Sequence, residues 1–410
     1  MNARFLHVTP IAPLPYGNGL AMRTSLFAEA LGRIGAVDIL VVGDEPPMQP
    51  RHGFGGHQVS LLSTHQRHDT KLGLISAIPD AFSRAAALRE NGRPFATRAI
   101  SAPVVSDFMR LLAAGSWQGI VISRAHMLPL FTGLPQWPQV PIVVDLDDDD
   151  AGLARQGAEI ARRDGDEGRA QWLEAEADSF DILIGKAASQ VRLLTTASCD
   201  TAAAISVRIS CNSLEVVPNG IDIPAVDRAL AVGDKLIFVG NLSYGPNVDG
   251  LTWFVRDVWP PLRATRPEAR LVVAGSRPDR SLRRLCQAPG ITVLGDPPSL
   301  TSLYREAGAA IVPLRTGSGS RIKILEAGAH GVPVVSTHEG AAGLALDPDR
   351  HFFAAAADPT AFRNACLECL GNRGAARTRA QGLHEFVRER HDRNVIIASL
   401  ERVLGYAFGA

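Results

Sequence analysis

A loop rich in glycine and serine leads into an apolar helical pattern between residues 315 and 331. The segment reads Arg-Thr-Gly-Ser-Gly-Ser-Arg-Ile-Lys-Ile-Leu-Glu-Ala-Gly-Ala-His-Gly, and the apolar runs 309–312 and 332–335 flank it. The first N–H groups of a helix have no partner within the helix, and the helix dipole places positive potential behind them. The pattern therefore predicts an anion site that suits a phosphate or a diphosphate.

Three side chains of this helical pattern can complete such a site. Arg321 or Lys323 can add a full positive charge, and Glu326 can accept hydrogen bonds from both hydroxyls of a ribose. The residues alone leave a simpler alternative open. In that alternative, Gly317 and Gly319 form an ordinary loop, and Lys323 and Glu326, three positions apart, form an exposed ion pair on the helix.

Gly17 and Gly19 stand just before the first long helical pattern of the chain. Glycine at both positions lets the main chain approach a ligand closely. The rival interpretation is the fingerprint loop of NAD- or FAD-binding proteins, which needs a tight turn after a strand and a third glycine. Here Met22 takes the place of that third glycine, and a loop with three prolines separates the strand from Gly17, which disfavours a dinucleotide site.

His126 and a run of aspartates are the remaining candidates for chemistry. His126 comes soon after the apolar run 119–122, where an imidazole can orient or deprotonate a substrate hydroxyl, although a plain surface or half-buried histidine fits as well. Asp145–Asp150 holds five aspartates in six residues, and clustered carboxylates suit a divalent cation. A strand that runs into a solvated acidic loop is the simpler account. We therefore expect no metal site.

The cysteines do not predict a disulfide framework or a zinc site. Five cysteines are scattered along the chain, and the one close pair is Cys366 and Cys369 in a helical pattern. No second pair of cysteines or histidines completes four zinc ligands. We expect both side chains to pack as small apolar groups on a buried helix face.

Composition excludes several classes of protein. The 410 residues hold 42 Lys and Arg against 42 Asp and Glu, and a net charge of zero argues against a nucleic-acid partner. No run of 18 apolar residues occurs, and the N-terminus lacks the uninterrupted apolar core of a secretory signal. Residues 1–130 carry a net charge of +4, which leaves peripheral contact with the inner face of a membrane open. We expect a cytoplasmic protein.

Short apolar runs alternate with helical patterns along most of the chain. Such runs are typical of parallel strands that are covered on both faces, and the alternation indicates doubly wound α/β domains. The first series of predicted strands comprises residues 4–8, 37–42, 119–122, 141–144, 181–184 and 214–217. The second series comprises residues 235–239, 270–274, 291–294, 309–312 and 332–335.

The prediction is therefore an α/β protein with two doubly wound, Rossmann-like parallel-sheet domains that face each other across a cleft. Residues 1–217 form the N-terminal domain and residues 218–390 the C-terminal domain, because Pro218-Asn219-Gly220 favours a tight turn after a strand. The helical pattern at 391–410 is expected to return to the N-terminal domain. Ligands of such sheets bind outside the carboxyl ends of the strands.

Several segments in a fixed order carry a family resemblance. Val-Pro-Asn-Gly-Ile-Asp (217–222) and Phe-Val-Gly-Asn-Leu-Ser-Tyr-Gly-Pro-Asn-Val-Asp-Gly (238–250) precede Gly-Ser-Arg-Ile-Lys-Ile-Leu-Glu-Ala (319–327) and His-Gly-Val-Pro-Val-Val-Ser-Thr (330–337). Together they resemble retaining glycosyltransferases of the GT-B fold, in the large bacterial glycosyltransferase group 1 (family 4 type). The resemblance is close over about 215–345 and covers the rest only in layout.

The resemblance implies that a nucleotide-sugar binds mainly to the C-terminal domain and an acceptor to the N-terminal domain. It places Glu326 on the ribose hydroxyls, and it implies retention at the anomeric carbon without a metal or any cofactor beyond the nucleotide-sugar. The residues expected to act in catalysis are His126, Arg321 and Lys323. The residues expected to bind the donor are Gly17, Gly19, Gly240, Asn241, Ser318, Gly319, Ser320, Arg321, Lys323 and Glu326.

Two departures from the family pattern matter for the diphosphate. Many members have two glutamates eight positions apart, whereas the earlier position here is Ser318. Many also carry an Arg and a Lys just after the first strand of the C-terminal domain, where this chain has Asn241 and then Pro246 or Asn247. The charge of the diphosphate must then be met by Arg321, by Lys323 or by a residue of the N-terminal domain.

The resulting prediction is an enzyme that moves a sugar from a nucleoside diphosphate-sugar to an acceptor hydroxyl. The acceptor is a sugar, a lipid-linked molecule or a small molecule, in the synthesis of a polysaccharide, glycolipid or glycoconjugate. Two alternatives share the fold, because fold does not fix function. They are a nucleotide-sugar epimerase and a non-catalytic protein that binds a nucleotide or a glycan.

Overall fold

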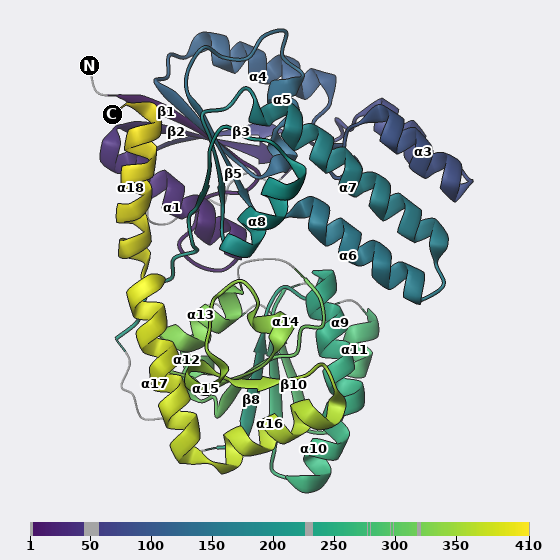
Figure 1. Cartoon of the computed structure of the whole chain (residues 1–410), viewed down its shortest axis with the longest axis vertical. Coiled ribbons are helices and arrows are strands. Elements are labelled where there is room, and N and C mark those ends of the chain that lie inside the picture. Colours follow the sequence, from purple (N-terminus) through teal and green to yellow (C-terminus); the bar gives the residue numbers. More distant parts are fainter. Residues whose placement is uncertain are drawn as a thin grey trace. The chain divides into compact units, whose positions relative to one another are not determined.

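The computed structural model describes residues 3–44, 57–225, 233–276, 278, 280–295, 297, 299–317 and 321–409. The chain divides into two compact units, residues 1–220 with 396–410 and residues 221–317 with 321–395. Each unit is a parallel β-sheet with helices on both faces (Figure 1). The prediction of two doubly wound α/β domains is therefore confirmed.

The N-terminal domain is built on a parallel sheet with the strand order β3-β2-β1-β4-β5-β6-β7 in the described part of the chain. Its strands are β1 (Arg4–Thr9), β2 (Ala36–Gly43), β3 (Gln58–Ser63), β4 (Gly119–Ser123), β5 (Ile142–Asp147), β6 (Leu193–Thr196) and β7 (Leu214–Val216). The chain winds outward to one edge from β1 and to the other edge from β4. The order reverses between these two strands, which is where ligands of such sheets bind.

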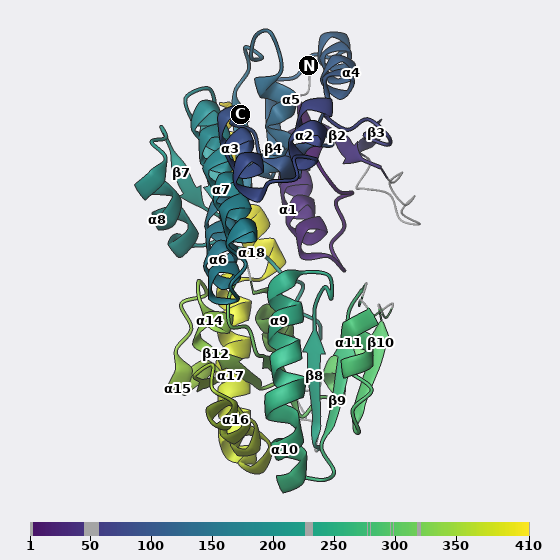
Figure 2. The same ribbon diagram turned by 90° about the vertical axis from the view of Figure 1, so that its right-hand side faces the viewer.

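Helices of the N-terminal domain cover both faces of the sheet. They are α1 (Gly19–Ile34), α2 (Thr70–Ser76), α3 (Ala81–Asn91), α4 (Ala102–Ala114), α5 (Pro129–Thr132), α6 (Asp150–Arg163), α7 (Glu167–Ala188) and α8 (Cys199–Arg208), with short 3-10 turns η1 (Phe95–Thr97) and η2 (Ala125–Met127). Helices α3, α6 and α7 pack side by side (Figure 2).

The predicted strand at 181–184 is wrong, because these residues belong to the last turns of α7. Leu183 and Ile184 are buried in the core, whereas Ile182 is 40% exposed. A short apolar run fits either a strand or a helix, so its periodicity does not separate the two. The strand of this region is β6, whose Leu-Leu-Thr-Thr sequence is buried throughout.

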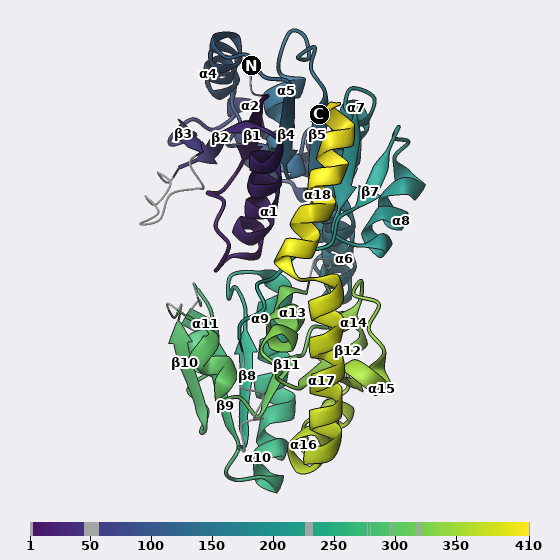
Figure 3. The same cartoon turned by 90° about the vertical axis from the view of Figure 1, so that its left-hand side faces the viewer.

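The last helix of the chain, α18 (Arg393–Phe408), packs on the N-terminal domain beside α1 (Figure 3). Ile397, Leu400 and Leu404 are fully buried in a cluster with residues of α1 and β1. The ring of Phe408 stacks on that of Phe5 with 5.1 Å between centroids. Apolar positions three to four residues apart give α18 one buried face.

The C-terminal domain repeats the same strand order, β10-β9-β8-β11-β12-β13, in a parallel sheet. Its strands are β8 (Lys235–Val239), β9 (Arg270–Ala274), β10 (Ile291–Gly295), β11 (Ala309–Val312), β12 (Val334–Thr337) and β13 (Phe353–Ala355). Its main helices are α9 (Gly245–Trp253), α10 (Trp259–Thr265), α11 (Arg280–Leu285), α12 (Thr301–Arg305) and α13 (Ile322–Ala329). They are followed by α14 (His338–Ala341), α15 (Pro348–His351), α16 (Pro359–Gly371) and α17 (Arg373–Arg390), and a π-helical turn, η3 (Phe254–Val258), joins α9 to α10. The order reverses between β8 and β11.

The cysteine pair lies on the buried face of α16. Cys366 and Cys369 are fully buried in the core of the C-terminal domain. Burial raises the pKa of the Cys369 thiol to about 12, so the thiol stays protonated. The expectation that both side chains act as small apolar groups is confirmed.

No helix among the described residues has the length and apolar character needed to cross a bilayer.

Candidate functional site

The loops that follow β8 and β11 begin on neighbouring strands, at the point where the strand order of the C-terminal sheet reverses. Gly240 and Asn241 lie in the first loop, which leads into α9. Lys323 and Glu326 lie on α13, which follows the second loop. Ser318, Gly319 and Ser320 lie outside the described residues. The structure thus brings together both ends of the predicted donor site.

Helix α13 begins directly after Arg321, whose φ of 46° is left-handed. Ile324, Leu325 and Ala327 are buried against the domain core, and this packing fixes which face of the helix carries the polar residues. Gly328 is in close contact with α17, because a Cβ at this position would lie 2.7 Å from a methyl carbon of Val387. The helix is therefore held rigidly by its apolar side.

Arg321 is 7% exposed, and its guanidinium ties the loop to its surroundings. Nη2 donates to the carbonyl oxygen of Gly317 at 2.6 Å and to that of Glu339 at 2.8 Å. The side chain thus stabilises the end of the loop, and its charge lies close enough to lower the pKa of Lys323.

The ammonium of Lys323 is held by a neutral group. Nζ donates to Oδ1 of Asn247 at 2.8 Å and lies 5.9 Å from the centroid of the Phe238 ring. Burial, together with the nearby charge of Arg321, lowers the pKa of Lys323 to about 7. The ammonium therefore gains from any anion that binds beside it.

The carboxylate of Glu326 is also held by a neutral group. The hydroxyl of Tyr304 donates to Oε2 of Glu326 at 2.9 Å. Burial raises the pKa of Glu326 to about 7, although the bond from Tyr304 and the charge of Lys323 oppose the shift. The alternative of an exposed Lys323–Glu326 ion pair is wrong, because both residues are half-buried and each bonds to a different neutral partner.

Tyr304 and His330 both form hydrogen bonds with Glu326, and neither was predicted from the sequence as a site residue. Their rings stack with 4.6 Å between centroids and an angle of 17°. Nδ1 of His330 lies 2.9 Å from the carbonyl oxygen of Glu326, so Nδ1 carries the hydrogen, because a carbonyl oxygen only accepts. Tyr304 is 1% exposed and lies 22 positions before Glu326, a separation that no local pattern reveals.

In the N-terminal domain, the loops after β1 and β4 occupy the corresponding place. Gly17 has a φ of 87°, which favours glycine, and Oδ1 of Asn18 accepts from the N–H of Leu20 at 2.8 Å and caps α1. Gly19 is the first residue of α1. Both glycines therefore lie at the carboxyl edge of the sheet.

His126 lies in η2, directly after β4, and its side chain is 29% exposed. Its ring packs edge-on against Phe180 with 5.2 Å between centroids, and Nδ1 lies 3.7 Å from Oδ2 of Asp150. Burial lowers the pKa of His126, so the imidazole is neutral at pH 7 and can accept a proton.

The aspartate run is not a solvated loop, which corrects the sequence interpretation. Asp145, Asp149 and Asp150 are 0%, 7% and 8% exposed. Arginines neutralise most of the run: Arg23 pairs with Asp145 and Asp147, Arg124 with Asp147 and Asp150, and Arg208 with Asp149. Asp148 has a pKa raised to about 6, mainly by burial. Within the described residues, no group of three or more His, Cys, Asp or Glu side chains is arranged to hold a metal ion.

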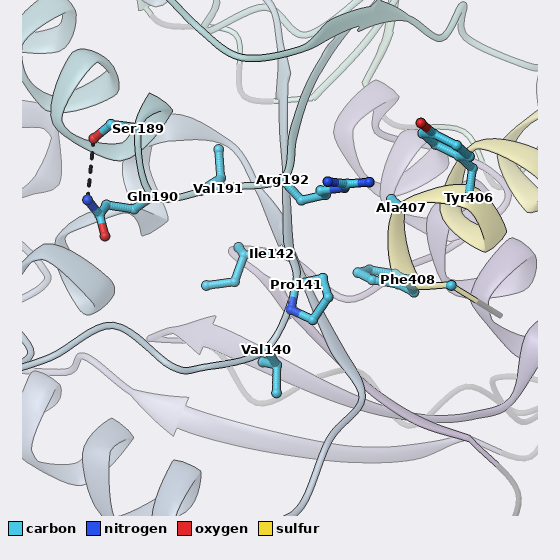
Figure 4. Close-up of a pocket in the computed structure, with 11 residues that line it drawn as sticks. Val140, Pro141, Ile142, Ser189, Gln190, Val191, Arg192, Tyr406, Ala407 and Phe408 are labelled. Atoms are coloured by element: carbon cyan, nitrogen blue, oxygen red, sulfur yellow. Dashed lines mark hydrogen bonds between the residues drawn. The ribbon is translucent and has the colours of Figure 1, made fainter.

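A pocket at the opposite, amino end of the N-terminal strands is separate from these residues (Figure 4). It is lined by Ile142 at the start of β5, by the turn before β6 and by the end of α18. The guanidinium of Arg192 lies 5.8 Å from the centroid of the Tyr406 ring in this pocket. None of the predicted site residues lines it.

Comparisons with known proteins match part of the chain in sequence and the whole chain in fold. Residues 233–372 match the family described as "Glycosyl transferases group 1". A curated relative from Klebsiella pneumoniae, "Uncharacterized 44.6 kDa protein in cps region", is 25% identical over 174 residues, which is 40% of this chain and 45% of that protein. The match thus spans about half the length of the curated relative.

Solved structures share the fold over the whole chain. Sucrose-phosphate synthase from Thermosynechococcus elongatus is 15% identical, with a TM-score of 0.71 over 99% of both chains. A TarM variant from S. aureus in complex with fondaparinux, alpha-GlcNAc-glycerol and UDP is 8% identical, with a TM-score of 0.70 over 100% of both chains. HepE from Anabaena in complex with UDP and glucose is 14% identical, with a TM-score of 0.67 over 98% of this chain and 99% of that one.

The class of protein follows from the fold and from the family match together. The fold is GT-B, two Rossmann-like domains with the same strand order. Residues 233–372 match the glycosyl transferases group 1 family and contain the polar site on α13. The match and the fold together indicate a glycosyltransferase.

Proposed function

We propose that this protein transfers a sugar from a nucleoside diphosphate-sugar to an acceptor hydroxyl, in the synthesis of a polysaccharide, glycolipid or glycoconjugate. The observation that carries the proposal is the pair Lys323 and Glu326, a cation and a carboxylate one helical turn apart. Each bonds to a neutral partner, and both lie where the strand order of the C-terminal sheet reverses. UDP in the TarM and HepE structures supports a nucleotide-sugar donor.

The donor's diphosphate is proposed to bind beside Lys323. Asn247 provides no negative charge, so the ammonium is not neutralised by its hydrogen-bond partner. A diphosphate beside the ammonium raises the pKa of Lys323 again and keeps the group charged. In the transfer step, negative charge develops on the departing diphosphate, and a fixed ammonium stabilises that charge without reorganising.

The ribose of the donor is proposed to bind Glu326. A carboxylate accepts hydrogen bonds from two adjacent hydroxyls, and Tyr304 fixes one of its oxygens from the protein side. Arg321 keeps the loop in place through Gly317, and its charge adds to the positive potential of the site. Gly17, Gly19, Gly240, Asn241, Ser318, Gly319 and Ser320 are proposed as main-chain and loop contacts of the donor.

The acceptor is proposed to bind the N-terminal domain at the edge that carries His126. A neutral imidazole can accept a hydrogen bond from a sugar hydroxyl and can take its proton during transfer. The five aspartates of the run outnumber the three arginines that pair with them, which disfavours an anionic acceptor and suits an uncharged hydroxyl acceptor such as a sugar, the sugar end of a lipid-linked molecule or a small molecule. Retention and transfer without a metal or other cofactor belong to this proposal, as the family resemblance implies.

A transfer assay on two variants tests the proposal. We expect Lys323→Ala to lower kcat/KM about 100-fold, as removal of one charge-stabilising group does, and Glu326→Ala to raise the KM for the donor about tenfold. The matched controls are Lys235→Ala and Glu306→Ala, which break an exposed ion pair in the same domain. Equal activity in all four variants contradicts the proposal. Conversion of the nucleotide-sugar without an acceptor points to an epimerase instead.

A further inference from the structure

The side chain of Asn247 joins the loop after β8 to the helix after β11. Its Oδ1 accepts from Nζ of Lys323 at 2.8 Å, and its Nδ2 donates to the carbonyl oxygen of Asn241 at 2.9 Å. An ammonium only donates and a carbonyl oxygen only accepts, so the two bonds fix which way the amide faces. The amide therefore directs its one acceptor at the ammonium.

The surroundings of Asn247 allow no other placement of its amide. The residue is 4% exposed, and its main-chain N–H donates to the carbonyl oxygen of Tyr244 at 2.9 Å in the first turn of α9. A Cβ at Gly240 would lie 2.8 Å from Nδ2 of Asn247, so the absence of a side chain at Gly240 provides the space for the amide. Close packing of this kind locks the rotamer.

The amide holds the ammonium without neutralising its charge. Glu326, the carboxylate nearest in sequence, accepts from the hydroxyl of Tyr304, and Lys323 donates to the neutral amide of Asn247. A carboxylate at position 247 would form a buried ion pair and compete with an anionic ligand. An alanine at this position would remove the acceptor and free the long lysine side chain to sample other rotamers.

We propose that Asn247 is a positioning residue of the donor site, which holds the Lys323 ammonium through a neutral hydrogen bond at the place where the donor's diphosphate binds. The inference rests on the proposed function, because it needs Lys323 to bind the diphosphate. Asn247 acts through Lys323 and bonds to no part of the donor. Asparagine at this position thus determines both the location and the charge of the cation.

A double-mutant cycle tests the inference with UDP as the probe. The variants are Asn247→Ala, Asn247→Asp, Lys323→Ala and the double variant with alanine at both positions, and calorimetry gives the UDP affinity of the full chain. We expect Asn247→Ala to weaken UDP binding about tenfold in the parent and less than about twofold when Lys323 is already alanine, because residues in contact couple. We expect the nearly isosteric Asn247→Asp to weaken binding more than Asn247→Ala, since the carboxylate neutralises the ammonium.

The outcomes separate this inference from the proposed function. If Lys323→Ala weakens UDP binding and Asn247→Ala weakens it by the same factor with or without Lys323, Asn247 acts through something else and the inference is overturned. The same holds if Asn247→Asp binds UDP as tightly as the parent. If Lys323→Ala leaves UDP affinity unchanged, the proposed role of Lys323 fails, and the inference fails with it. A thermal unfolding midpoint within a few degrees of the parent shows that each variant is folded.

Discussion

The two domains have the same strand order but treat charge in opposite ways where that order reverses. In the N-terminal domain, buried carboxylates in β5 and just after it pair with arginines from α1, from the residue after β4 and from α8. In the C-terminal domain, Lys323 and Glu326 each bond to a neutral side chain. Charges paired within the protein are not free for a ligand, whereas charges with neutral partners are. The difference supports the proposal that the anionic donor binds the C-terminal domain and an uncharged acceptor binds the N-terminal domain.

The Arg23–Asp145 pair is the most deeply buried example of the charge pairing described for the N-terminal domain. Arg23 is 1% exposed and donates to both carboxylate oxygens of Asp145, at 2.7 Å and 2.6 Å. It also donates to the carbonyl oxygen of Val217 and to Oδ1 of Asn219. The guanidinium thus joins α1, β5 and the segment that leaves the domain, which makes it a structural group.

The largest effect is expected from breaking that pair. Asp145→Ala leaves the Arg23 guanidinium buried without its main partner, which should lower the free energy of unfolding by about 3–5 kcal/mol. Asp107→Ala removes a partly exposed carboxylate from Arg67 and Arg110 and should have a much smaller effect, because solvent screens exposed ion pairs. Urea unfolding measures both. Similar small losses in the two variants would show that the N-terminal pairs are not the structural charges that the comparison requires.

A smaller effect is expected from Tyr304→Phe, which removes the neutral hydrogen-bond partner of Glu326 in the C-terminal domain. The variant removes the bond that holds the pKa of Glu326 down, so that pKa should rise further above about 7. Because an ionised carboxylate accepts the ribose hydroxyls, UDP affinity should be about tenfold below that of the parent at pH 7, and this difference should shrink as the pH rises to 9. Calorimetry across this range measures it. An affinity profile with the parent's midpoint would contradict the role given to Tyr304.

The smallest effect is expected in the pH dependence of stability. The folded protein raises the pKa of Glu326 from 4.5 to about 7, so the folded form binds the proton more tightly than the unfolded chain. The corresponding stability is present below pH 4.5 and is lost as the pH rises through 7. Glu326→Gln should therefore be more stable than the parent at pH 8, by on the order of 1 kcal/mol, and lose this advantage at pH 4.5. A variant that is less stable at pH 8 would show that Glu326 is not a destabilised carboxylate.

Local patterns were enough to predict the elements that position the site. The loop and helix at 315–331 could be predicted because a Gly/Ser loop between a strand and an apolar helix is a local signal. Helix α13 lies within this segment, and β11 precedes it. The run at 181–184 was wrongly predicted as a strand, because three apolar residues in a row satisfy a strand or one face of α7. A short apolar run does not by itself show whether it forms a strand or continues a long helix, and here the folded structure shows the helix.

The partners of the site residues were beyond the reach of local patterns. Asn247 stood out only as a departure from a family pattern, and its bond to Lys323 spans 76 positions. Tyr304 reaches Glu326 because α12 and α13 flank β11, which is a consequence of tertiary packing. The burial of the aspartate run has the same origin, since Arg23 and Arg208 come from segments far from it in sequence.

A crystal structure of the full chain with UDP tests the central claim most directly. We expect an oxygen of the diphosphate to lie within hydrogen-bond distance of Nζ of Lys323, and the ribose hydroxyls to reach the carboxylate of Glu326. UDP bound elsewhere, with neither side chain in contact with the nucleotide, would contradict it.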